Sequence, residues 1–208
     1  GGGTAGSHWD KRIIANEFMN PTTVDNPVVF SAISMALFED TGWYKPDYSQ
    51  AVHLPWGFKE GCNFIKQSCK IGWSDKYFCD KAYSSPGRRY EGCASIDFRG
   101  RGYCDVVTYT AALPSQYQYL ANPAQGGSNA HMNFCPTFKA YSNTPCNQGF
   151  RRNSNLRAIY GEHASMLNEN GFCFSGDYMY GRSKDSSSHQ ACHDIECEAD
   201  LKSYNVNF

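Results

Sequence analysis

Residues 6–21 read GSHWDKRIIANEFMNP, and this stretch decides how the rest of the chain is interpreted. It places His8 on a short polar segment and, eleven residues later, Met19 just before Pro21, where a turn is expected. A neutral imidazole is the commonest zinc ligand, and a tight turn that carries a polarizable thioether can form the floor of a metal site. A single histidine is usually an ordinary side chain, so it is the combination of His8 with Met19 that suggests a site.

The motif around His8 resembles the second half of the active site of the leishmanolysin family of metzincin zinc endopeptidases. In metzincins two zinc ligands come from a His-Glu-x-x-His helix, a third histidine follows, and a methionine turn lies beneath the metal. The resemblance implies that His8 is the third zinc ligand and that Met19 is the methionine of the turn, which does not itself bind the metal. The residues that carry the match are Thr4-Ala5-Gly6-Ser7-His8-Trp9, Arg12, Glu17, Met19 and Pro21.

The first half of such a site is absent, because no histidine of the chain begins a His-Glu-x-x-His motif. The resemblance therefore implies that the general-base glutamate and two zinc ligands come from a segment upstream of Gly1. Catalytic zinc has three protein ligands, so one imidazole cannot hold Zn²⁺ tightly. We expect this chain alone to be inactive and to be a piece of a longer protein. Arg12 and Glu17 are interpreted as structural residues that pair across the turn.

The composition bounds the class of protein. The formal net charge is −1, and charges of both signs are interspersed, which argues against nucleic acid or an anionic membrane as partner. No apolar run approaches the roughly 20 residues that cross a bilayer, so no transmembrane segment is expected. The 14 Tyr and 13 Phe residues favour a packed, β-rich protein.

Ten cysteines, an even number, predict five disulfides and an oxidising compartment, hence an extracellular or cell-surface location. No Cys-x-x-Cys spacing occurs, which disfavours structural zinc sites. The spacing does not reveal the pairing of these residues, which are Cys62, Cys69, Cys79, Cys93, Cys104, Cys135, Cys146, Cys173, Cys192 and Cys197.

All ten cysteines fall after residue 61, which predicts two domains within an α+β fold. Residues 1–61 are expected to be the C-terminal half of a metzincin catalytic region, with the Met-turn and one helix over about residues 28–40. Residues 62–208 are expected to form a β-rich, disulfide-stapled C-terminal domain that continues beyond Phe208.

Helical spacing of Phe30, Ile33 and Leu37 predicts that these side chains face the core, and Gly42 is placed to end the helix. Asn26-Pro27 is typical of the residues that begin a helix. Alternating apolar residues and turn signals predict three strands, at Gly102–Ala112, Phe172–Tyr180 and Ser203–Phe208.

The leading hypothesis is the C-terminal part of a secreted or cell-surface zinc metalloendopeptidase that acts on proteins or peptides. The alternative is a non-catalytic surface or matrix protein that keeps the fold as a structural or binding module. His189 and His193 are spaced to share a helix face, but polar flanks and the lack of a following Glu favour an exposed loop over a metal site. No role in metal binding is assigned to His131 or His163.

Overall fold

The computed structural model describes residues 3–22, 28–70, 76–146, 171–175, 190–197 and 204–207. The chain divides into two compact units, the first made of Gly1–Trp73 and Thr108–Cys135 and the second of Ser74–Val107 and Pro136–Phe208. These units do not follow the cysteine-free and cysteine-rich parts of the sequence, since residues 62–73 and 108–135 belong to the first. That a catalytic region ends at residue 61 stays a prediction.

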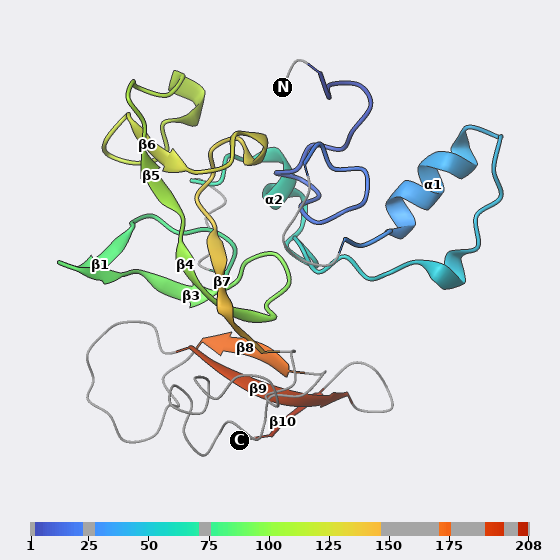
Figure 1. Cartoon of the computed structure of the whole chain (residues 1–208). Coiled ribbons are helices and arrows are strands. Elements are labelled where there is room, and N and C mark those ends of the chain that lie inside the picture. The colour runs from blue at the N-terminus through green and yellow to red at the C-terminus, as the bar shows by residue number, and fades with distance from the viewer. Residues whose placement is uncertain are drawn as a thin grey trace. The chain divides into compact units, whose positions relative to one another are not determined.

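The first unit holds short helices joined by long irregular segments (Figure 1). Its elements are α1 (Ala32–Asp40), η1 (Tyr48–Gln50), α2 (Cys62–Lys66), η2 (Ser115–Tyr117), β6 (Gln125–Gly127) and η3 (Ala130–Met132). The second unit is built from strands: β1 (Tyr83–Ser85), β2 (Arg88–Arg89), β3 (Glu91–Cys93), β4 (Gly100–Cys104), β7 (Phe138–Pro145), β8 (Gly171–Ser175), β9 (Gln190–Cys197) and β10 (Tyr204–Asn207). Strand β5 (Val106–Thr108) crosses the boundary between the two units.

The predicted helix is present, but it begins four residues later than expected, at Ala32. The backbone of Val29 is already in use: its N–H donates to the carbonyl oxygen of Asn16 at 2.9 Å, and its carbonyl accepts from Phe18 N–H at 2.8 Å. This parallel bridge keeps the chain extended up to Ser31, the N-cap position of α1. The residues predicted to begin the helix, Asn26 and Pro27, lie outside the described part of the chain.

The helix ends as predicted. Gly42 adopts a left-handed backbone (φ +73°), and its N–H donates to the carbonyl oxygen of Glu39 at 2.8 Å. Glycine has no Cβ to clash in this conformation, which is why it commonly terminates helices.

The predicted core face of α1 is wrong. Phe30, Ile33 and Leu37 are 37%, 46% and 38% exposed, whereas Ser34 and Met35 are buried at 0% and 3%. The helix therefore turns a polar hydroxyl and a thioether inward. The reason lies in the candidate site described below, where Ser34 has a hydrogen-bonding partner.

The second unit contains two three-stranded antiparallel sheets, ordered β3-β4-β7 and β10-β9-β8. Strands β8 and β10 confirm two of the predicted strands over the residues that the structure describes. The third prediction, Gly102–Ala112, is split into β4 and β5 at Asp105. The Asp105 N–H donates to the carbonyl oxygen of Thr137, and its carboxylate accepts from Thr137 N–H at 2.8 Å.

Four disulfides are formed among the described residues, and the part of residues 62–208 that the structure describes is rich in strands, as predicted. The pairs are Cys69–Cys135 in the first unit and Cys79–Cys104, Cys93–Cys173 and Cys146–Cys192 in the second. The prediction that all ten cysteines are paired is wrong for Cys62, whose exposed thiol is free among the described residues. The side chain of Cys197 lies outside the described part.

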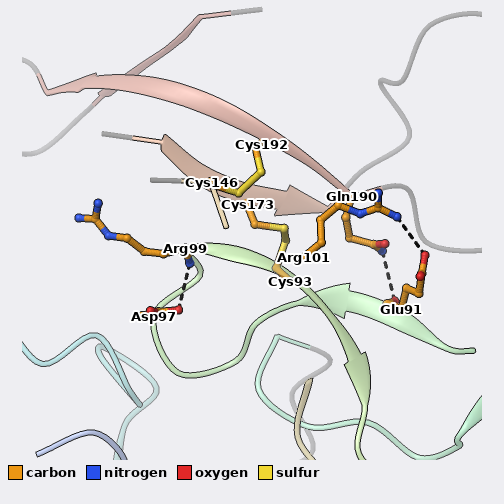
Figure 2. The surroundings of a disulfide bond; sticks show 9 residues. All are labelled: Glu91, Cys93, Asp97, Arg99, Arg101, Cys146, Cys173, Gln190 and Cys192. Carbon is orange, nitrogen blue, oxygen red and sulfur yellow. Dashed lines mark hydrogen bonds and ion pairs between the residues drawn. A yellow bond between two sulfur atoms is a disulfide. The ribbon is translucent and has the colours of Figure 1, made fainter. Parts of the chain in front are cut away.

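Two of these disulfides join the two sheets (Figure 2). Cys93 at the end of β3 bonds to Cys173 in β8, and Cys146, just after β7, bonds to Cys192 in β9. Cys173 and Cys192 are direct partners in the β8–β9 pairing, so the two crosslinks lie together and form a buried cluster against Phe98.

Polar contacts flank the crosslinks. The Arg101 guanidinium lies 3.1 Å from the Glu91 carboxylate, and Gln190 Nε2 donates to the Glu91 carbonyl oxygen at 3.2 Å (Figure 2). Burial raises the pKa of Asp97, whose carboxylate accepts from Arg99 N–H at 3.0 Å. Because the cysteines that join the sheets are far apart in sequence, by 80 and 46 residues, the crosslinks restrict the unfolded chain strongly.

Candidate metal site

His8 lies on an exposed segment of turns in the first unit. Ser7 N–H donates to the carbonyl oxygen of Thr4 at 3.3 Å, which closes the turn before the histidine. The Ser7 hydroxyl is 2.9 Å from Nδ1 of the His8 ring. When Nδ1–H donates to that oxygen, Nε2 carries the lone pair, and a partner on one ring nitrogen is what orients histidines that bind metal through the other.

Trp9, the next residue, connects this segment to two others. Its backbone N–H donates to the Met19 carbonyl oxygen at 3.0 Å. Its indole Nε1–H donates to the hydroxyl oxygen of Ser34 in α1 at 2.8 Å. The chain beside His8 is thus bonded both to the Met19 turn and to the helix that follows it.

The turn that carries Met19 runs from Glu17 to Asn20, and it is closed by a hydrogen bond from Asn20 N–H to the Glu17 carbonyl oxygen at 3.1 Å. The Glu17 side chain is 1% exposed and binds both sides of the turn. One oxygen accepts from Met19 N–H at 2.6 Å, and the other accepts from the N–H and the hydroxyl of Ser31, each at 3.1 Å. The Met19 side chain itself is partly buried.

Arg12 anchors the same segment to the region around α2. Its guanidinium donates to the Phe64 carbonyl oxygen at 2.8 Å and lies 4.7 Å from the centre of the Phe64 ring. The indole N–H of Trp56 donates to the Arg12 carbonyl oxygen at 3.1 Å. Burial lowers the pKa of the guanidinium, although arginine stays charged at any physiological pH. Arg12 and Glu17 are structural residues, as predicted; that they pair with each other stays a prediction.

Among the described residues, no group of three or more His, Cys, Asp or Glu side chains is close enough to hold a metal ion. His193 lies in β9 of the second unit, where it is buried and packs against Phe174 with ring centres 6.0 Å apart. The predicted exposed loop is therefore wrong for His193, because the pairing of β9 with β8 places this residue in a sheet. His163 and His189 lie outside the described part of the chain. Met19 and Glu17 are brought near the backbone beside His8.

The donor at His8 fits zinc in its chemistry. The ring is solvent-accessible, one nitrogen has a hydrogen-bonding partner, and imidazole nitrogen is a standard zinc ligand. One ligand makes only part of a site, so His8 could hold the metal together with donors from elsewhere. The Trp9–Ser34 contact was not predicted, since nothing in the sequence marks a serine inside a helix as the partner of a distant indole.

Comparison with known proteins identifies the class. The family model described as leishmanolysin, a peptidase family, matches residues 1–208. Leishmanolysin of Leishmania tropica is 27% identical across 99% of this chain, and the leishmanolysin-like peptidase of Drosophila pseudoobscura pseudoobscura is 35% identical across 68% of it. A leishmanolysin-like peptidase of Caenorhabditis elegans is 34% identical across 68%.

The chain therefore belongs to the leishmanolysin family of metallopeptidases. It spans only a part of these relatives, covering 30%, 23% and 24% of their respective lengths. The predicted resemblance is confirmed at the level of the family.

Proposed function

We propose that this chain is the C-terminal part of a secreted or cell-surface zinc metalloendopeptidase. The observation that carries the proposal is the leishmanolysin match over residues 1–208, which includes an exposed His8 whose Nδ1 lies 2.9 Å from the Ser7 hydroxyl. In the complete protein His8 Nε2 would bind zinc together with two histidines of an upstream His-Glu-x-x-His helix.

Each residue of the segment has a distinct task in this proposal. Ser7 is a hydrogen-bonding partner that orients the His8 ring, and Met19 supplies the apolar floor of the site on a turn that Glu17 stabilises. Bound zinc would polarise a water molecule and the carbonyl of a peptide bond. The general base that accepts the proton of that water would be the glutamate of the upstream helix.

The disulfides support the proposed secreted or cell-surface location. Four disulfides in the described part of the chain are typical of the secretory pathway rather than of a reducing compartment. Among the described residues, no helix is long and apolar enough to cross a membrane. Proteins or peptides are the proposed substrates.

The test uses the complete protein that contains this chain. We expect one bound zinc per molecule by mass spectrometry and cleavage of peptides, both lost in His8→Ala. His53→Ala is the matched control, because His53 is also exposed and packs on Phe58 instead. Its zinc content and activity should equal those of the parent.

Two outcomes would contradict the proposal. One is a complete protein that binds no zinc and cleaves no peptide, which is the behaviour of a non-catalytic surface module. The other is a His8→Ala variant that keeps the zinc content and activity of the parent.

A further inference from the structure

We propose that Trp9 is a positioning residue that sets the place of His8 relative to the Met19 turn. This inference rests on the proposed function, since it concerns how the zinc ligand is held. It adds a role for two residues, Trp9 and Ser34, that do not touch the metal.

The first part of the evidence is where the two hydrogen bonds act. The backbone N–H of Trp9 is one residue from the His8 backbone, and its bond to Met19 fixes the distance between ligand and turn. The hydrogen bond from the Trp9 indole to Ser34 fixes the orientation of the Trp9 side chain, because Ser34 is fully buried in α1. Together they hold the backbone next to His8 at two points.

The second part is that His8 lies in an exposed segment, while the residue that follows it does not. Gly3 and residues 5–8 are exposed, and the turn there is closed by the hydrogen bonds from Ser7 to Thr4, at 3.3 and 3.4 Å. Thr4 is partly buried, and the next partly buried residue is Trp9, directly after His8. Displacement at Trp9 would therefore carry His8 with it.

The third part is the side chain itself. Of the aromatic residues, tryptophan alone combines a large apolar surface with an N–H donor, and that donor reaches 25 residues along the sequence to Ser34. Phenylalanine would keep most of the packing but could not donate. The serine hydroxyl is equally specific, because alanine leaves the partly buried indole N–H without this acceptor.

Mutation of the residues that hydrogen-bond to metal ligands typically changes metal affinity or activity by 10- to 100-fold. Loss of the Trp9 indole N–H or of the Ser34 hydroxyl should weaken zinc binding by a factor in the same range. The turnover number kcat should fall as well, because zinc would supply the activated water. A purely structural role would lower stability without changing the metal environment.

The experiment uses the complete protein and compares Trp9→Phe, Ser34→Ala and the double variant with the parent. Zinc affinity is measured by competition with a chelator, and the metal environment by the visible spectrum after cobalt replaces zinc. We expect each single variant to bind zinc at least about tenfold more weakly and to shift the cobalt spectrum. The double variant should be no worse than either single one, because both remove the same bond.

Thr22→Val is the matched control. Thr22 accepts a hydrogen bond from Lys11 Nζ at 2.7 Å, so this variant also removes a bond within the same region, but neither partner adjoins His8 or Met19. Its zinc affinity and cobalt spectrum should equal those of the parent. Ser34→Ala keeps the indole, so it remains informative if Trp9→Phe does not fold.

The outcomes separate this inference from the proposed function. A parent that binds no zinc overturns both. A parent that binds zinc, with unchanged affinity and cobalt spectrum in Ser34→Ala, overturns the role of Trp9 alone. Additive losses in the double variant would overturn it too, because they would mean that the two side chains act independently.

Discussion

Replacing Glu17 by glutamine tests the central contact of the candidate site. The buried carboxylate accepts three hydrogen bonds, one from Met19 N–H and two from Ser31. Glutamine has the same shape but only one acceptor oxygen, so its amide NH₂ must face either the Met19 N–H or the Ser31 N–H. Whichever way it turns, one buried backbone donor loses its partner, which costs about 1–3 kcal/mol.

The assay is urea unfolding of the 208-residue chain with its disulfides intact. All four tryptophans precede residue 74 in the sequence, so tryptophan fluorescence reports on the first unit. With a urea dependence of about 2 kcal/mol/M, the transition of Glu17→Gln should move down by roughly 0.5–1.5 M. Glu39→Gln is the control: this exposed carboxylate accepts a single hydrogen bond from Tyr48, which a glutamine oxygen can also accept. Equal midpoints for the two variants would refute the reasoning.

Three further predictions concern other parts of the chain. Burial and, next, a hydrogen bond to the Glu91 carboxylate raise the pKa of Tyr141 from 10.0 to about 12, so the neutral phenol stabilises the fold below pH 10 and this contribution is lost as the pH rises through 12. The difference in unfolding free energy between the parent and Tyr141→Phe should therefore shrink over that range, and a constant difference would contradict this prediction. Iodoacetamide should label the exposed Cys62 in the native chain, and mass spectrometry should find the eight disulfide-bonded cysteines unmodified. An unmodified Cys62 would contradict the structure. Gly102→Ala should destabilise the second unit by about 1–3 kcal/mol, because the added Cβ would lie 2.6 Å from the Lys139 carbonyl oxygen. Gly3→Ala is the control, since its Cβ would meet no atom within 4 Å, and equal thermal stability of the two variants would contradict the prediction.

The sequence predicts well where a local cause decides the structure. Gly42 ends α1 because the left-handed conformation favours glycine wherever it occurs. The motif around His8 and Met19 led to the family, which the comparison confirms. Strands β8 and β10 follow from alternating residues that need no knowledge of their partners.

Long-range contacts explain what the sequence does not reveal. The start of α1 depends on Val29 bonding to residues of the turn more than ten positions earlier. The free thiol of Cys62 depends on which cysteines meet in space, and an even number of cysteines does not ensure that every one finds a partner within the described chain.

The orientation of α1 shows why apolar spacing misjudged its buried face. Covering the exposed parts of Ile33 and Leu37, which are 46% and 38% exposed, would gain about 1 kcal/mol each. Rotating the helix to do so would break the bond from Trp9 to Ser34 and pull on the two bonds from Ser31 to Glu17. Hydrogen bonds to a charged group contribute about 1.5–3 kcal/mol each, and an orphaned buried donor costs about 1–3 kcal/mol more. The polar contacts therefore outweigh the apolar gain, and the helix faces the way that holds Trp9 and Met19 in place.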